Sequence, residues 1–350
     1  MTPVRIRRSA DEGAAADPPR SPGELLDRLY ARRGQAASGV DLALAGLAPC
    51  GSLAGIDAAV EVLTGTIRAG RSILVVGDYD ADGATGSALG VLGLRALGAP
   101  AVSYLVPSRF AFGYGLSPQV VDAAAPGRPG LIVTVDNGIA AVAGVERANA
   151  LGIPVLVTDH HLAGDVLPAA AAIVNPNQPG CPFPSKHLAG VGVVFYVLAA
   201  LRASLRRAGW FRTSRPEPNL ASLLDLVALG TVADVVTLDL NNRILVEQGL
   251  RRIRAGSCRP GIRALLQVAG RDPGRATAAD LGFFAGPRLN AAGRLEEMSI
   301  GVECLLEEDP ARALDLATRL HELNRQRRDI EDGMRAEAEY LVERLTFRGD

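Results

Sequence analysis

The chain has 350 residues, 48% of them hydrophobic, and its formal net charge is -1. This length and composition suit a protein with a large apolar core, in one large domain or two smaller ones. A net charge near zero excludes a surface that is basic all over, so a polyanion would have to bind at a local patch.

The cysteines and the apolar runs limit the setting in which the protein works. Its four cysteines lie far apart with no Cys-x-x-Cys pair, which argues against a zinc knuckle or a disulfide framework and favours a reducing, cytoplasmic location. Residues 1–22 contain arginines but no apolar stretch, which predicts a disordered leader. The longest apolar run, 188–201, is shorter than the roughly 20 residues of a membrane helix, so we expect no membrane segment and no membrane partner.

From about residue 70 to 180, short β-branched runs alternate with helical stretches rich in Ala and Gly. This alternation predicts an α/β fold with a doubly wound, mostly parallel sheet, which binds ligands beyond the carboxyl ends of its strands. The predicted strands are 73–76, 102–106, 131–135, 154–157 and 172–174, and the predicted helices are near 84–98, 117–125 and 139–151.

Beyond residue 185 the strand pattern stops, and helices are predicted near 189–208, 219–230, 241–255 and 259–268. From Pro310 to Leu345, apolar residues at helical spacing stand among dense charge, which predicts an exposed connecting helix. The predicted organisation is a leader at 1–22, a catalytic domain at 23–310 and the connecting helix at 311–350. Within the catalytic domain, the α/β core covers about 70–180 and the helical part about 185–310.

Three aspartates, Asp78, Asp80 and Asp82, follow the first predicted strand. Alternate residues of an extended segment face the same side, so the carboxylates could converge on one cation. A calcium loop would need a glutamate at its twelfth position, where this chain has Leu89, and a phosphate-binding loop would end in Gly-Lys-Ser or Gly-Lys-Thr. Metal binding is the favoured interpretation, with a solvated turn as the alternative, and not all three need be ligands.

Two further strands also end in polar motifs, Asp136-Asn-Gly and Asp159-His160-His161. The first would be an ordinary turn if it stood alone, but it shares the sheet edge with the others. Neighbouring imidazoles point in different directions, so one histidine could bind a metal while the other stabilises charge or moves a proton. Oxygen ligands with one or two imidazoles suit Mn²⁺ or Mg²⁺, and paired ions commonly cleave phosphodiesters.

Two arginine-containing segments are candidates for substrate binding. Arg109 and Tyr114 follow a predicted strand, where Arg109 could grip a phosphate and Tyr114 could stack a base; a plain surface loop is the alternative. Arg288, Asn290 and Arg294 offer two guanidiniums and an amide in a Gly-rich segment. Helix capping would explain the Gly and Pro residues there but not the two arginines.

These motifs, together with Gly230-Thr-Val-Ala-Asp234, resemble the DHH phosphoesterase family. The longer sequence segments 174–184, 225–236 and 286–294 are similar to those of the bacterial RecJ nucleases of that family. The resemblance implies two Mn²⁺ or Mg²⁺ ions that share Asp136. It further implies that Asp80 completes one site, that Asp82, His160 and Asp234 complete the other, that His161 lies over the scissile phosphate and that Asp78 supports the ligands.

The same resemblance implies 5′-3′ exonuclease activity on single-stranded DNA in repair and recombination, with a single-strand-binding protein and a helicase as further partners. A nanoRNase or cyclic dinucleotide phosphodiesterase is an alternative within the same enzyme class, and a catalytically inactive scaffold or binding module is an alternative outside it. Family members carry a second domain after the connecting helix, and RecJ proteins add an oligonucleotide-binding barrel. We expect this chain to lack both.

Overall fold

The computed structural model describes residues 18–32, 41–109 and 112–344. The predicted leader, 1–22, falls almost entirely outside them. The chain divides into two compact units, Met1–Asp41 and Leu42–Asp350, whereas the sequence placed its boundaries at 22 and 310. The first unit contains helix α1 (Pro22–Arg32), none of whose described residues is buried. The second unit contains all the elements described below.

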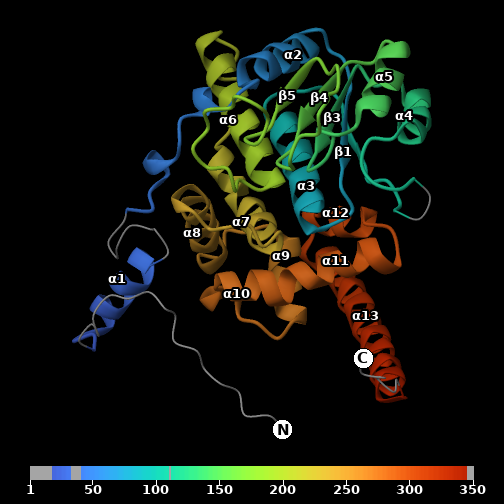
Figure 1. The fold of residues 1–350 in the computed structure, drawn as a ribbon. Coiled ribbons are helices and arrows are strands. Elements are labelled where there is room, and N and C mark those ends of the chain that lie inside the picture. Colours follow the sequence, from blue (N-terminus) through green and yellow to red (C-terminus); the bar gives the residue numbers. More distant parts are fainter. Residues whose placement is uncertain (1–17, 33–40, 110–111, 345–350) are drawn as a thin grey trace. The chain divides into compact units, whose positions relative to one another are not determined.

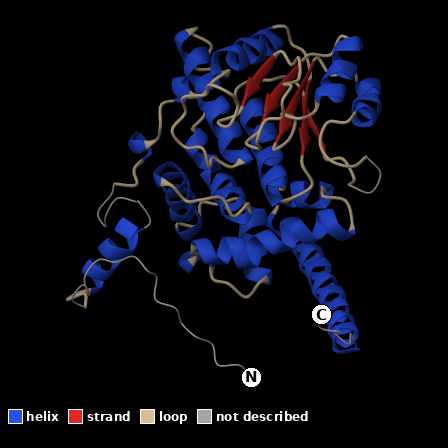
Figure 2. Ribbon diagram, in the orientation of Figure 1, coloured by secondary structure: helices blue, strands red, loops and turns tan. Residues whose placement is uncertain are grey.

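The second unit is built on a parallel sheet of five strands in the order β2-β1-β3-β4-β5. Figure 2 shows the strands of this sheet in red. This confirms the predicted doubly wound α/β fold. Chain order reverses between β1 and β3, which is where such sheets bind their ligands. The strands are β1 (Ile73–Gly77), β2 (Val102–Leu105), β3 (Leu131–Val135), β4 (Val155–Thr158) and β5 (Ala172–Val174).

Helices cover both faces of the sheet, because alternate side chains of each strand point to opposite faces (Figure 1). In β1, Ile73 and Val75 join the larger core cluster, which also contains the buried faces of helices α2 (Ile56–Arg68), α3 (Ala81–Ala96) and α6 (Gly190–Arg207). Leu74 and Val76 join the smaller cluster with α4 (Pro118–Ala124) and α5 (Val142–Ala150). Burial on both faces explains why the strands read as unbroken apolar runs.

The rest of the second unit is helical, as predicted, and each predicted helix lies within a few residues of an observed one. The longer helices are α7 (Leu224–Ala233), α8 (Leu240–Arg254), α9 (Pro260–Val268), α11 (Gly286–Leu295), α12 (Ser299–Leu306) and α13 (Pro310–Arg344). Shorter helical segments are Leu44–Gly46, Cys50–Ser52, Ala125–Gly127, Leu220–Leu223, Pro273–Arg275, α10 (Ala278–Asp280) and the π-helix Leu281–Ala285.

The last helix was predicted to be an exposed connecting helix, but its first half is partly buried. Ala313, Ala317, Leu320 and Leu323 of α13 are buried in the main core, because their spacing of three or four residues gives one apolar face. Beyond Asn324, the described side chains are mostly exposed. The first four turns of α13 therefore pack into the main core.

Within the part of the chain that the structure describes, no single helix is both long and apolar enough to cross a membrane. The segments Leu44–Ser52 and Ile56–Arg68 meet that test only as a pair, with a bend of 87° between them. All four cysteines are free thiols, as their spacing predicts.

Candidate metal centre

Three aspartates stand side by side at the carboxyl edge of the sheet. The backbone N–H of Asp78 donates to Val135 O (3.2 Å), that of Asp136 to Thr158 O (3.0 Å) and that of Asp159 to Val174 O (3.1 Å). The sheet pattern thus continues one residue beyond β1, β3 and β4. This brings the three predicted strand-end motifs together, with Asp136 in the middle.

Asp136 is 1% exposed, and its φ of 61° lies in the left-handed region, which aspartate and asparagine tolerate better than most residues. The next residue fixes the turn, since Asn137 Nδ2 donates to Val76 O (3.1 Å) and Val135 O (2.9 Å). Helix α6 begins against this turn at Gly190. A Cβ there would lie 2.7 Å from the Asp136 Cβ, so only glycine allows the approach.

The predicted ligands gather into three overlapping groups, in each of which the potential ligand atoms lie within 4.8 Å of one another. Asp136 belongs to two groups and His160 also to two, so these residues link the cluster. The groups are Asp78, Asp80 and Asp136; Asp136, His160 and His161; and Asp82, His160 and Asp234. All five predicted ligands are therefore brought together, while the division between two ions stays a prediction.

Three atoms of this cluster are buried without a hydrogen-bond partner among the described residues: Asp136 Oδ1, His160 Nε2 and Asp234 Oδ2. The imidazole nitrogen is 3.0 Å from the Asp136 oxygen and 3.6 Å from the Asp234 oxygen. Ligands at about 2.1 Å from an octahedral ion are about 3 Å from their neighbours. Buried lone pairs at this spacing fit a bound cation, since each would otherwise carry an uncompensated desolvation cost.

The crowding of carboxylates in the cluster also indicates a bound cation. Burial and the neighbouring Asp80 carboxylate raise the pKa of Asp78 and of Asp234 to about 7. Burial and nearby carboxylates raise the pKa of Asp82 and Asp136 well above the ordinary range. Carboxyl groups crowded in a low-dielectric site can all be ionised only if a cation compensates their negative charge. The donor set of carboxylates with one imidazole suits Mn²⁺ or Mg²⁺.

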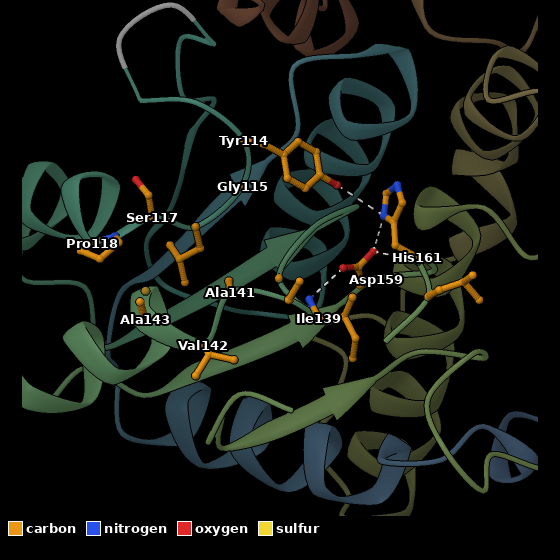
Figure 3. A pocket seen from close by; sticks show the side chains of 15 residues that line it. Tyr114, Gly115, Ser117, Pro118, Ile139, Ala141, Val142, Ala143, Asp159 and His161 are labelled. Atoms are coloured by element: carbon orange, nitrogen blue, oxygen red, sulfur yellow. Dashed lines mark hydrogen bonds and ion pairs between the residues drawn. The ribbon is translucent and has the colours of Figure 1, made fainter. Parts of the chain in front are cut away.

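His160 and His161 have different surroundings, as predicted for adjacent imidazoles. Burial lowers the pKa of His160 to about 4, which keeps the ring neutral and its lone pair available to a metal. His161 Nδ1 lies 2.7 Å from Asp159 Oδ1, and this hydrogen bond raises the pKa of His161 (Figure 3). With Nδ1 held by a carboxylate, Nε2 is the nitrogen left to face a substrate.

Asp159, the first residue of the Asp-His-His motif, positions this turn and belongs to none of the ligand groups. Its Oδ1 accepts from the backbone N–H groups of His160 (2.7 Å) and His161 (3.1 Å), and its Oδ2 from Ile139 N–H (2.9 Å). Burial alone would raise its pKa, but these bonds and the one from His161 outweigh burial and hold the pKa of Asp159 below its usual value. It is therefore a buried carboxylate that stays ionised.

Two asparagines to which the sequence assigned no role hold the same turn from behind. Asn175 Nδ2 donates to His161 O (2.9 Å) and Asn177 Nδ2 to His160 O (2.5 Å). Asn177 N–H in turn donates to Asn175 Oδ1 (2.7 Å). The sequence motif Val-Asn-Pro-Asn at the end of β5 was the only sequence signal for these two asparagines. Each histidine thus has its backbone fixed on both sides.

Asp80 and Asp82 also have structural contacts. Asp80 caps α3, since its Oδ1 accepts from Gly83 N–H (2.9 Å). Asp82 is fully buried, and its two oxygens accept from the N–H groups of Gly190 (2.6 Å) and Val191 (3.0 Å) at the start of α6. Each carboxylate oxygen has a second lone pair, so these bonds leave room for a metal.

Of the predicted substrate residues, Tyr114 borders the cluster, and Arg109 lies over the ring of Tyr79. The Tyr114 hydroxyl donates to Asp136 O (3.2 Å) and lies 3.4 Å from His161 Nδ1. Tyr79, which the sequence did not single out, links the two residues. The rings of Tyr79 and Tyr114 pack edge-on, with their centroids 6.1 Å apart. The Arg109 guanidinium lies 4.8 Å from the centroid of the Tyr79 ring.

The other three predicted substrate residues have three different environments. Asn290 Oδ1 accepts from Ala81 N–H (2.7 Å) at the start of α3, beside the cluster. Arg288 is 5% exposed and donates to Phe284 O (2.7 Å) and toward His321 Nδ1 (2.9 Å). Arg294 is exposed at the end of α11. Their roles in substrate binding stay predictions.

A parallel sheet with a carboxylate and imidazole cluster at its switch point defines a class of metal-binding α/β proteins. Residues 72–231 match the family model described as DHH family, N-terminal domain. A crystal structure of exonuclease RecJ bound to manganese is similar over 81% of this chain and 68% of that one, with 38% identity and a TM-score of 0.71. The chain belongs to the DHH family, and its relatives there are RecJ proteins.

Curated relatives agree. The single-stranded-DNA-specific exonuclease RecJ of Salmonella typhimurium is 60% identical over 97% of this chain, and that of Escherichia coli is 58% identical over 97%. The chain spans 59% of the length of each. The structure of Thermus thermophilus RecJ in complex with Mn²⁺ is 36% identical and covers 89% of this chain and 43% of its own, with a TM-score of 0.71.

Proposed function

We propose that this chain is a metal-dependent exonuclease that hydrolyses single-stranded DNA from its 5′ end. The observation that carries the proposal is the convergence of Asp136 Oδ1, His160 Nε2 and Asp234 Oδ2 as buried atoms without hydrogen bonds. The curated relatives support the substrate, since they are single-stranded-DNA-specific exonucleases. The 5′ polarity rests on the resemblance to RecJ.

We propose two ions, Mn²⁺ or Mg²⁺, held by the five predicted ligands. Asp136 would be shared, Asp80 would complete one site, and Asp82, His160 and Asp234 would complete the other. Such ions act as Lewis acids toward a phosphate and lower the pKa of a bound water. Solved structures of RecJ in complex with Mn²⁺ and with Mg²⁺ support both metals.

The pair His161 and Asp159 supplies the proton chemistry of the proposed reaction. The Asp159 carboxylate favours the protonated imidazole, and Nε2 then carries a proton that can be donated to the departing 3′ oxygen. Three backbone N–H groups hold the Asp159 carboxylate, and its fourth hydrogen bond orients the His161 ring. Tyr114 adds a hydroxyl within 3.4 Å of the same ring.

The alternatives are less well supported. A nanoRNase or cyclic dinucleotide phosphodiesterase is not favoured, because the curated relatives are exonucleases of DNA. An inactive scaffold is not favoured either, since all five predicted ligands are present and together. A single-strand-binding protein, a helicase and a cytoplasmic location stay predictions, as do the domain boundaries.

The test compares the parent with Asp136→Asn on single-stranded DNA labelled at its 3′ end, with Mn²⁺ and with EDTA. Asparagine suits the left-handed backbone of this position better than alanine, so folding should be kept. The control is Asp122→Asn, which removes a carboxylate from an exposed ion pair with Arg147. We expect Mn²⁺-dependent shortening of labelled strands by the parent and by the control only.

Two results would contradict the proposal. Cleavage that persists in Asp136→Asn would mean that the cluster is not the catalytic centre. Loss of the 3′ label before any shortening would mean the opposite polarity. Matched RNA and double-stranded DNA test the substrate class, and equal rates on them would remove the proposed specificity.

A further inference from the structure

Strand β2 forms an open edge of the sheet. In the described part of the chain it pairs with β1 only. Ala101 O accepts from Ile73 N–H of β1 (2.9 Å). Because the backbone groups of successive residues in a strand alternate between its two sides, those of Val102 and Tyr104 face outward. The Arg95 guanidinium donates to Val102 O (2.7 Å) and covers that position. Tyr104 has no such cover among the described residues, so its N–H and C=O groups can pair with another chain.

Two cavities flank this open edge, one on each face of the sheet, and Tyr104 lines both. The cavity on the α4 face has a volume of about 260 Å³ and lies between β1, β2 and the segment 123–129. None of its lining residues is charged, and among them are Leu105, Ala123 and Pro129. We call it the neutral cavity. It suits a small or apolar side chain, because a charge there would have no partner.

The cavity on the other face has a volume of about 580 Å³ and lies between Tyr104, the end of α12 and the start of α13. Its charged residues are four carboxylates and one guanidinium: Glu303, Glu307, Glu308, Asp315 and Arg312. Arg312 Nε is 3.2 Å from Glu307 Oε2, and in the described part of the chain the other three carboxylates form no ion pair. Burial and the nearby Glu303 raise the pKa of the Tyr104 hydroxyl, so this negative charge lies close to the strand. We call this space the acidic cavity.

We propose that the edge of β2 binds an extended segment of a partner protein in which basic residues alternate with apolar ones. The segment would hydrogen-bond to the N–H and C=O groups of Tyr104 and add a strand to the sheet. Alternate side chains of a strand point to opposite faces, so one set would enter the neutral cavity and the other the acidic cavity.

The charges of the two cavities select the partner. Arginine or lysine suits the acidic cavity, because three carboxylates there have no cation of their own. A nucleic acid does not fit, since the same carboxylates would repel its phosphates. The inference does not depend on the proposed nuclease function, because none of the residues that carry it belongs to the metal cluster.

The first test measures binding of the fluorescent peptide Val-Arg-Val-Arg-Val-Arg by anisotropy. We expect the parent to bind this peptide at least about tenfold more tightly than Val-Val-Val-Arg-Arg-Arg, which lacks the alternation, and Val-Glu-Val-Glu-Val-Glu, which has the opposite charge. A variant without the three unpaired carboxylates should bind the alternating basic peptide about tenfold more weakly than the parent. Its substitutions are Glu303→Gln, Glu308→Gln and Asp315→Asn, all at exposed positions. The matched control removes three exposed carboxylates from the second half of α13: Asp329→Asn, Glu337→Gln and Glu339→Gln.

The second test locates the bound peptide. An added strand should slow the hydrogen exchange of the Tyr104 amide at least about tenfold, with little change at Leu105, whose N–H faces β1. Ala123→Trp should fill the neutral cavity and weaken binding of the peptide. Ala150→Trp, at the exposed last residue of α5, is the control and should bind the peptide as the parent does.

Several results would overturn the inference. These are no binding by the parent, equal binding of the three peptides, equal binding by the two carboxylate variants, and binding that leaves the exchange of the Tyr104 amide unchanged. Slower exchange at Tyr104 as the protein concentration rises, with no peptide present, would mean that a second copy of the chain covers the edge. That result would also overturn the proposed partner.

Discussion

Asp136 at the carboxyl edge of the sheet and Asp225 in α7 are both buried, with exposures of 1% and 0%. Burial raises the pKa of each. Asp225, however, accepts from the N–H groups of Leu226 (3.0 Å) and Arg259 (2.7 Å). Asp136 instead has an oxygen without a hydrogen bond and carboxylates as neighbours. Burial alone therefore does not distinguish a functional carboxylate; missing partners and like-charged neighbours do.

Asp136→Asn should show the largest difference between the carboxyl edge of the sheet and the buried site in α7. We expect kcat/KM for single-stranded DNA to fall by about a thousandfold or more, because a residue shared by both proposed ions is lost. The melting temperature of the metal-free protein should rise, since one of several repelling charges is removed. Activity assays and thermal melts in EDTA check the two effects, and a variant that is inactive but less stable than the parent would contradict the second.

His161→Gln tests the proton role apart from the metal role. We expect kcat to fall by about 10²–10⁴-fold, the usual contribution of a general acid, with Mn²⁺ affinity nearly unchanged. If protonated His161 is the acid, the parent should lose activity as pH rises through the raised pKa of this residue, and the variant should lack that limb. The measurements are a pH profile of kcat and a metal titration. A large loss of Mn²⁺ affinity would make His161 a ligand instead.

Asn177→Ala should weaken activity or Mn²⁺ affinity by about 10–100-fold, the range found for residues that orient metal ligands. The control is Asn149→Ala, because Asn149 also donates its amide to a backbone carbonyl, that of Ala169, away from the histidines. Both variants lose one such bond, so an equal effect would mean a general loss of stability. Metal titration of each, beside its melting temperature, separates the cases.

Asp225→Asn should have the opposite profile to Asp136→Asn. An amide has one acceptor oxygen where the carboxylate has two, so one of the two backbone N–H groups loses its partner. We expect the free energy of unfolding to fall by about 1–3 kcal/mol, with activity per folded molecule retained. Urea denaturation and kcat measured below the transition check this. A stable but inactive Asp225→Asn would end the distinction between the two regions.

The smallest expected effect is the pH dependence of the free energy of unfolding of the metal-free protein. The pKa of Asp78 and Asp234 is about 7 in the folded chain against 3.8 unperturbed, so folding binds protons between about pH 4 and 7. The free energy of unfolding should therefore fall as pH rises through that window and stay low above it. His160, with its pKa lowered to about 4, acts in the opposite direction but is outnumbered by the carboxylates.

Thermal melts in EDTA from about pH 5 to 8 should show a decrease on the order of several degrees. Mn²⁺ should raise the melting temperature more at the higher pH, where fewer protons compete for the carboxylates. A metal-free protein that becomes more stable as pH rises would contradict the charge crowding deduced from the structure.

Local patterns were sufficient to predict the sheet and the place of the site. All five predicted strands were found, because parallel strands are buried on both faces and read as apolar runs. The motifs after β1, β3 and β4 had to meet, since carboxyl ends of parallel strands share an edge. Different roles were predicted for the two histidines because neighbours in an extended segment diverge, and their surroundings do differ.

What the sequence did not predict depends on contacts between distant segments. Asn290 meets Ala81, a residue 209 positions away, and Asp82 meets Gly190 across 108 positions. The substrate role of Arg288 stays a prediction, but the contact of its guanidinium with His321 of α13 was not predicted, and neither was the burial of the first half of that helix. Side-chain direction at such positions is set by packing, which no local pattern contains.

The two hydrogen bonds from the N–H groups of Gly190 and Val191 to Asp82 should depend on whether a metal occupies the centre. A carboxylate that shares its electrons with a cation is a weaker acceptor, so metal loading should loosen the first turn of α6. The exchange rates of these two amide protons with deuterated water would then measure occupancy of the centre from a helix that contains none of its proposed ligands.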